Sequence, residues 1–424
     1  MSAPIIPTIL TIPTIPTTPT TPTGPTGPAF TTAATACRPA TAASSSTATT
    51  STNAAAAAAL IAHQGFDEAF VFWHARYADD PPTALAALAA LARRAARDRR
   101  HQLAASYDAM HCALRRGSPW YPATLGARLL SLPQAPVSSG RLRHDAAQLD
   151  YLHQLGALGD EFPSIIAGLR LLAHRLEAGQ PCHRELASMV AQSHAGDSSP
   201  LDQLDDVYDR IVHLRPTPCV AQALPAHTAR ALQAAQQAPG HGIVVIDDFL
   251  SAEALDELLR FCLQSTVWLC ELGHGRLGAS YEHGFNCPLL VQLLVELREL
   301  LPGMPQHGHA LPYLDACKHP PRLPGEALQA DQGDVKLQLW LTPDAANLDP
   351  ATGGMFIRAP DGNTRYIAYR QNRAVLFPAR LLHGAAARHF RDDHQGRRLD
   401  VNLRYRSTRY STPSARRPAM ASSS

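Results

Sequence analysis

Short strand-like runs separated by turns fill the stretch from Lys336 to Tyr405, and they constrain the fold of this chain more than any other feature. Two helix-like segments precede them, one capped by Ser251 and running to about Cys262, the other running from Pro288 to Leu300. Many short strands after two helices predict a β-barrel or a double-sheet jelly roll. The expected strands are 243–246 before the helices and 336–341, 355–358, 365–368, 374–377 and 399–405 after them.

The preceding part of the chain has a helical pattern, because apolar residues recur there at three- and four-residue spacing. Residues 58–214 are therefore expected to form an all-helical domain, joined by a connector at 215–240 to a jelly-roll domain at 241–407, so the fold class is α+β. The helical part resembles degenerate tetratricopeptide-type repeats, with a plain helical bundle as the alternative, since no clean repeat period is present. Its expected helices are 84–97 (capped by Thr83), 103–114, 144–155 and 164–176.

Both ends of the chain have a low-complexity composition. Residues 1–57 are rich in Pro, Thr, Ala and Ser, and residues 408–424 in Ser, Arg and Pro, so both are expected to be disordered tails. A basic region followed by an apolar one, which marks a secretory signal, is missing from the N-terminus, and no apolar run could span a membrane. We therefore expect a cytoplasmic protein without a membrane partner; an organelle-targeting role for the Ser/Thr-rich tail stays open.

Charge and cysteine content exclude several classes of function. The net charge of +2 argues against nucleic acid as a partner. The eight cysteines include no Cys-x-x-Cys pair and are expected to be reduced thiols. The sequence contains no phosphate-binding P-loop, dinucleotide-binding glycine motif or nucleophile elbow.

The C-terminal third carries a carboxylate, a distant histidine and a following arginine, each beside a strand-like run: Asp331, His383 and Arg398. Non-heme iron enzymes hold Fe(II) with two histidines and one carboxylate, which leaves coordination positions open for a co-substrate and dioxygen. The planar fork of an arginine suits bidentate binding of a carboxylate. This order of residues therefore indicates an oxygenase-type site.

Residues from about 241 to 407 resemble the prolyl-hydroxylase-like branch of the 2-oxoglutarate/Fe(II) dioxygenases. The resemblance implies that Asp331 and His383 are iron ligands, that Arg398 anchors 2-oxoglutarate, and that ascorbate could support the reaction. The motifs that carry it are Val245-Ile246-Asp247-Asp248-Phe249-Leu250-Ser251, Gly275-Arg276-Leu277-Gly278, Gly284-Phe285-Asn286-Cys287-Pro288, Leu339-Trp340-Leu341-Thr342-Pro343, Gly353-Gly354, Asn372-Arg373-Ala374-Val375-Leu376-Phe377 and Arg398-Leu399-Asp400-Val401-Asn402.

One ligand of the expected site is replaced. The family's His-x-Asp motif reads Gln329-Ala330-Asp331 in this chain, so the proximal histidine is a glutamine. An amide oxygen is a weaker donor to Fe(II) than an imidazole nitrogen. Gln329 could still complete the metal site, or one of the upstream histidines could take its place: His307, His309 or His319.

Two functions follow as hypotheses. In the first, the protein hydroxylates an unidentified substrate, for which a protein or peptide is one candidate, and releases succinate and CO₂. In the second, it is a catalytically inactive oxygenase-fold protein that acts as a binding or scaffold module. In both, the helical domain could recruit a protein or peptide partner, because helical arrays present extended concave surfaces.

Overall fold

A computed structural model describes residues 66–116, 138–179, 207–208, 211–237, 242–281, 284–301, 303–304 and 313–405. All of these belong to one compact unit, Thr49–Ser424. The tails predicted at 1–57 and 408–424 lie outside the described residues. The described part combines helices with antiparallel sheets, as predicted, and none of its helices is long and apolar enough to cross a membrane.

The C-terminal part contains two larger antiparallel sheets and one small one. The large sheet has the strand order β1-β9-β6-β12-β4-β3-β2, a second sheet has the order β10-β7-β8, and β11 pairs with β5. The strands are β1 (Val244–Ile246), β2 (Cys270–Glu271), β3 (Leu277–Ser280), β4 (Tyr313–Lys318), β5 (Arg322–Leu323), β6 (Val335–Trp340), β7 (Met355–Arg358), β8 (Thr364–Ile367), β9 (Ala374–Pro378), β10 (His383–Ala385), β11 (Arg388–His389) and β12 (Leu399–Tyr405).

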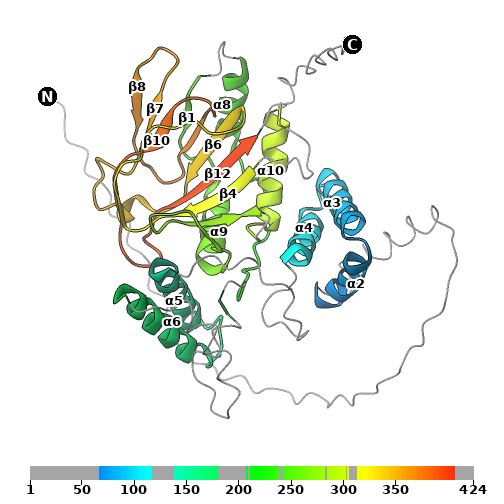
Figure 1. The fold of residues 1–424 in the computed structure, drawn as a ribbon. Coiled ribbons are helices and arrows are strands. Elements are labelled where there is room, and N and C mark those ends of the chain that lie inside the picture. The colour runs from blue at the N-terminus through cyan, green and yellow to red at the C-terminus, as the bar shows by residue number, and fades with distance from the viewer. Residues whose placement is uncertain are drawn as a thin grey trace, which may run out of the picture. The chain divides into compact units, whose positions relative to one another are not determined.

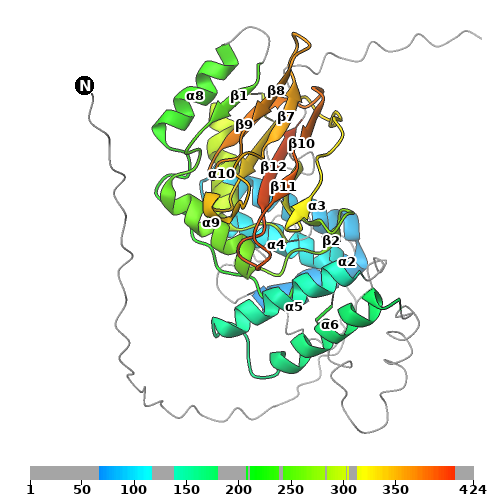
Figure 2. The ribbon, with the colours of Figure 1, turned by 90° about the vertical axis from the view of Figure 1, so that its left-hand side faces the viewer.

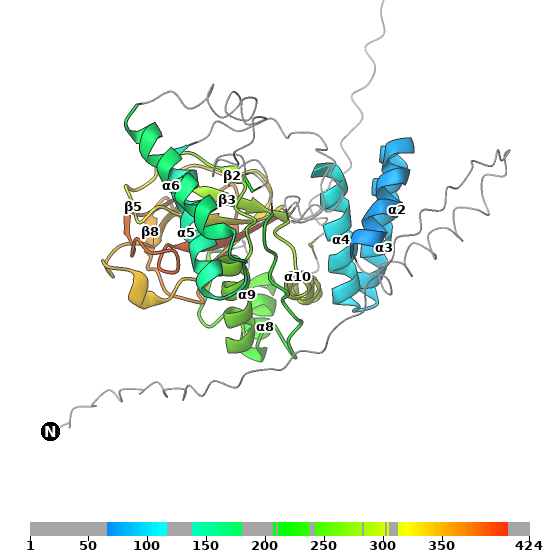
Figure 3. The same ribbon diagram turned by 90° about the horizontal axis from the view of Figure 1, so that it is seen from below.

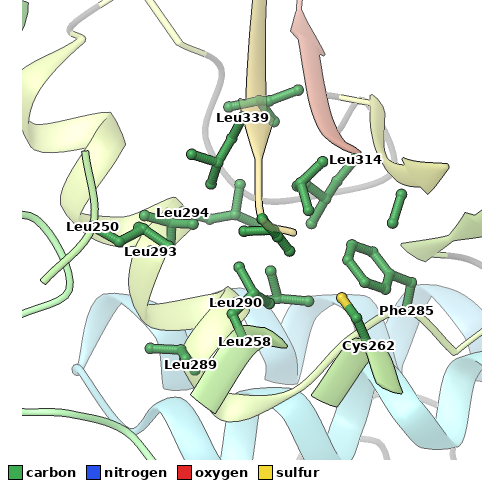
Figure 4. Close-up of a cluster of buried hydrophobic side chains, with 14 of the residues drawn as sticks. Leu250, Leu258, Cys262, Phe285, Leu289, Leu290, Leu293, Leu294, Leu314 and Leu339 are labelled. Carbon is green, nitrogen blue, oxygen red and sulfur yellow. The ribbon is translucent and has the colours of Figure 1, made fainter. Parts of the chain in front are cut away.

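Three helices cover one face of the large sheet: α8 (Ala226–Gln237), α9 (Ala252–Gln264) and α10 (Pro288–Leu300). Figures 1 and 2 show these helices on one side of the large sheet and β7, β8 and β10 on the other. The main core lies between the helices and the sheet, where Leu258, Leu290 and Leu294 of the helices meet Leu314 and Leu339 of the strands (Figure 4). Burying such leucines contributes about 1.5–3 kcal/mol each.

Side chains point alternately to the two faces of β12. One face belongs to the main core, and the other faces the interior between the two larger sheets. Leu399, Val401 and Leu403 face the helices and join the main core. Arg398 precedes the strand and Asp400 follows two residues later, so both lie on the opposite face. That face also carries Trp340 of β6, which packs with Val375, Ile357 and other residues of both sheets in a separate core. The candidate site therefore lies on the inter-sheet face.

The N-terminal helices form two separate apolar clusters. Helices α2 (Phe66–Asp79), α3 (Pro81–Arg97) and α4 (His101–Arg116) share one cluster with Val291 and Val295 of α10. Helices α5 (Ser139–Gln154) and α6 (Phe162–Glu177) share the other and lie side by side (Figures 2 and 3). Whether these helices are degenerate repeats stays a prediction.

Several boundaries differ from the sequence prediction for local reasons. Asp80, not Thr83, caps α3: its carboxylate accepts from the Thr83 amide, and proline fits the first helical turn. Helix α8 lies inside the expected connector, and the absence of a strong apolar stripe concealed it. Strand β4 was not predicted because charged and polar residues interrupt its apolar pattern.

The predicted N-cap at Ser251 can be tested directly by mutation. The Ser251 hydroxyl accepts a hydrogen bond from the Ala254 amide at 3.3 Å, at the start of α9. We expect Ser251→Ala to lower the free energy of unfolding by about 1 kcal/mol, because one amide at the helix start loses its acceptor. Urea unfolding followed by circular dichroism measures this, and Ser251→Asp, which keeps an acceptor, should stay close to the wild type.

Candidate functional site

A short backbone bridge brings Asp331 and His383 together. The Gln329 amide donates to the His383 carbonyl and the His383 amide donates to the Gln329 carbonyl, both at 2.9 Å. The Asp331 amide donates to the Ala379 carbonyl at 2.9 Å. As a result, Asp331 Oδ2 lies 3.4 Å from His383 Nε2, although the two residues are far apart in sequence.

The tautomer of His383 follows from its backbone contact. His383 Nδ1 lies 2.7 Å from the Leu381 carbonyl oxygen, which can only accept, so Nδ1 carries the proton. In the neutral ring, the lone pair of Nε2 then points toward the site. This is the orientation in which an imidazole can bind a cation or accept a hydrogen bond.

A lysine lies between the two predicted metal ligands. Lys336 Nζ of β6 donates to Asp331 Oδ2 at 2.7 Å and to His383 Nε2 at 3.0 Å. The Lys336 side chain is 12% exposed and that of Asp331 is 17% exposed, so these contacts are largely shielded from water. Arg404, the cross-strand neighbour of Lys336 on β12, places Nη1 3.7 Å from the same carboxylate oxygen. Asp331 is therefore neutralised by cations of the protein itself.

The charge distribution agrees with this geometry. Contact with His383 and the positive charge of Lys336 hold the pKa of Asp331 well below its usual value, although partial burial acts in the opposite direction. Asp331 is therefore a carboxylate at neutral pH.

The donor set does not fit Fe(II). The Gln329 side chain is exposed and makes no hydrogen bond within the described part of the chain, so its backbone, not its amide group, takes part in the site. An ammonium group is not a metal ligand, and the ammonium of Lys336 occupies the space between the two remaining donors. Among the described residues, no group of three or more His, Cys, Asp or Glu side chains is arranged to hold a metal ion.

Arg398 is fully buried and its guanidinium is already paired. Its Nε and Nη2 donate to the two carboxylate oxygens of Asp400, at 2.7 and 3.0 Å, and its Nη1 donates to the Gly353 carbonyl. The guanidinium also lies 5.5 Å from the ring centres of Trp340 and Tyr369. Asp400 therefore presents to Arg398 the bidentate carboxylate that the resemblance assigned to 2-oxoglutarate.

The Arg398–Asp400 pair is strongly ionised. Although burial opposes it, the charge of Asp400 raises the pKa of Arg398. Burial also opposes ionisation of Asp400, yet Arg398 and His319 hold the pKa of that carboxyl well below its usual value.

His319 does not supply the second imidazole of the predicted iron site. It follows β4, is buried, and places Nε2 2.9 Å from Asp400 Oδ2. Burial lowers the pKa of His319 to about 4, so the ring is neutral at physiological pH and Nε2 carries the proton that Asp400 accepts. The other two histidines proposed as substitutes, His307 and His309, lie outside the described residues.

Lys336 and Asp400 are the two residues that sequence reasoning missed. A signal was available for Lys336, because it is one of only two lysines in the chain and stands at the start of an apolar strand. Asp400 was also visible as a charged residue between Leu399 and Val401. Strand alternation turns both away from the helix-covered core, but it does not identify their partners.

No known family model and no curated protein matches the chain. Similar solved structures include a prolyl hydroxylase from Trichoplax adhaerens, in complex with a peptide fragment of the oxygen degradation domain of hypoxia inducible factor, at 15% identity and a TM-score of 0.32, covering 42% of this chain and 90% of that one. A Pseudomonas putida prolyl-4-hydroxylase is 14% identical with a TM-score of 0.31, and the match covers 42% of this chain and 98% of that one. An oxidoreductase of the 2OG-Fe(II) oxygenase family from Burkholderia pseudomallei is 8% identical with a TM-score of 0.29, and the match covers 45% of this chain and 94% of that one. The activity must therefore be argued from the side chains of this chain.

Proposed function

We propose that this chain is a non-catalytic relative of the 2-oxoglutarate oxygenases, a binding or scaffold protein whose own side chains occupy the cofactor positions. The observation that carries the proposal is the position of Lys336 Nζ, within 3.0 Å of both Asp331 Oδ2 and His383 Nε2. The ammonium supplies the positive charge that these two groups would otherwise receive from Fe(II).

Electrostatics favour this self-occupied site over an iron site. A metal ion would have to displace Lys336 from two hydrogen bonds and approach with only one imidazole and one carboxylate as strong donors. Hydrogen bonds to charged groups contribute about 1.5–3 kcal/mol each, so the displacement is costly. Arg398 is likewise occupied, because any carboxylate that binds its guanidinium competes with Asp400, two residues further along the chain.

The helical part would then supply the binding function. It is proposed to recruit a protein or peptide partner through the α2–α4 and α5–α6 clusters. This role rests on the presence of helices beside the jelly roll, and it is an analogy with helical repeat proteins.

An active oxygenase is the second candidate, and one observation favours it. Asp331 and His383 keep their proximity, with 3.4 Å between carboxylate and imidazole. If Lys336 rotated away, the Gln329 amide turned inward and Asp400 released Arg398, then Fe(II), 2-oxoglutarate and dioxygen could bind. One oxygen atom of dioxygen would hydroxylate a substrate C–H bond and the other would enter succinate, with release of CO₂.

Metal titration of the full-length wild-type protein separates the two candidates. We expect no stoichiometric Fe(II) or Co(II) binding and no succinate release from 2-oxoglutarate with ascorbate present, because Lys336 competes for both donors. Anaerobic calorimetric titration measures the first and succinate quantification the second. Tight binding of one metal ion per chain would reject the non-catalytic proposal.

A further inference from the structure

Arg388, on β11, is a buried guanidinium with unmet hydrogen-bonding capacity. Its side chain is 0% exposed, and its Nη2 donates to Glu326 Oε1 at 2.7 Å. Its Nε and Nη1 are also buried and find no acceptor among the described residues. Buried donors of this kind are rare in folded proteins and usually indicate a missing acceptor.

The carboxylate beside Arg388 is shared with another cation. Arg276 Nη1 donates to the same oxygen of Glu326, at 3.0 Å. Two guanidinium groups thus converge on one carboxylate, which leaves one excess positive charge. Leaving a buried cation incompletely paired is costly. An additional acceptor with a single negative charge would balance this group.

Arg398 does not compete for that acceptor, because Asp400 and the Gly353 carbonyl already pair with its guanidinium. Near Arg388, His319 also has an unused atom: Nδ1 is buried without a partner in the described part of the chain, whereas Nε2 faces Asp400. The charge of Arg388 contributes to the low pKa of His319, so the two side chains interact electrostatically. Unmet polar atoms therefore gather around Arg388.

Access to this position comes from the side of Glu326. The Glu326 side chain is 29% exposed and that of Arg276 is 26% exposed, whereas Arg388 beneath them is fully covered. An anion that passes this pair would meet the unused Nε and Nη1 donors of Arg388, beside the hydrogen bond from Nη2 to Glu326. Glu326 keeps its place, so the anion adds a second negative charge to the two guanidinium groups.

We propose that Arg388, together with Arg276 and Glu326, forms a binding site for a small carboxylate anion, separate from the Arg398 position. The inference rests on the proposed function in one respect, that Arg398 is occupied by Asp400. The single excess charge calls for one carboxylate group, which one end of a dicarboxylate such as succinate supplies. The planar fork of arginine matches the planar carboxylate group.

The test is calorimetric titration of the full-length, metal-free protein with succinate, with inorganic phosphate as the second probe. We expect succinate to bind the wild type and to raise its melting temperature. Arg388→Met, and Arg388→Lys, which keeps the charge but loses the fork, should each weaken succinate binding at least about tenfold. Arg391→Met is the matched control, because Arg391 is exposed and, among the residues that the structure describes, its guanidinium pairs with Asp393 of its own loop.

The proposal would be overturned by failure of the wild type to bind succinate, by binding of succinate to both Arg388 variants as tightly as to the wild type, or by binding of phosphate alone. Arg398→Met/Asp400→Leu should bind succinate like the wild type, and loss of binding in this variant would move the site to Arg398. Because these titrations use metal-free protein, a negative result leaves the wild-type iron titration, and with it the non-catalytic proposal, unaffected.

Discussion

Replacing Gln329 by histidine and Lys336 by alanine in the same chain should create a divalent metal site at Asp331 and His383. Gln329→His places an imidazole two residues before Asp331, where a strand-like backbone directs both side chains to one side. Lys336→Ala removes the ammonium from the space between Asp331 and His383. Two imidazoles and one carboxylate then form the facial arrangement that suits non-heme iron.

We expect the double variant to bind Co(II) or Fe(II) at one ion per chain, at least about a hundredfold more tightly than the wild type, because loss of an outer-shell partner alone changes metal affinity about 10–100-fold. Co(II) absorption spectra and calorimetry measure this. Gln329→His alone is the matched control, because Lys336 still occupies the site. Equal affinity in this single variant and the double variant would show that Lys336 is no barrier to the ion.

Breaking the buried pair on β12 should have the largest effect on stability. In Asp400→Leu, the guanidinium of Arg398 stays fully buried and loses both carboxylate bonds. Removing one partner of a buried ion pair costs about 3–5 kcal/mol, because an uncompensated charge remains in the interior. Urea unfolding should therefore show a strong decrease in the free energy of unfolding.

The double variant Arg398→Met/Asp400→Leu provides the control for that experiment. Replacing both charges by apolar side chains removes the uncompensated cation, so most of the lost stability should return. Loss in the double variant as large as in the single one would mean that the hydrogen bonds of Asp400 to His319 and Gln338, not its pairing with Arg398, dominate.

The same pair sets a pH dependence of stability. The pKa of Asp400 is lower in the folded chain than its unfolded value of about 3.9. Its contribution is thus fully present above that pH and is lost as the pH falls further through the folded value. The double variant should lack this part of the acid sensitivity.

The strands and helices around the candidate site could be predicted from the sequence, because local residue patterns determine where they begin and end. Alternating and apolar runs predicted β6, β7, β9 and β12 to within about one residue, and the proline and serine signals placed α9 and α10. These features depend on the period of side-chain directions and on caps, which are readable from neighbouring residues. Helix α8 and β4 were missed because weak or interrupted apolar patterns leave them to tertiary packing.

Local sequence patterns do not predict which side chains contact one another in the candidate site. The sequence by itself determined that a glutamine stands two residues before Asp331, that Asp331, His383 and Arg398 occur in order, and that side chains alternate between two faces along 399–405. Each of these facts is local or positional.

Only the tertiary structure decided what those residues touch. The bridge between Gln329 and His383 and the register of β6 against β12 place Lys336 between Asp331 and His383. A contact across 47 positions depends on strand register, and alternation fixes the face of a residue but not the partner it meets. For this reason the sequence predicted an iron site, whereas packing fills that position with a cation of the chain itself.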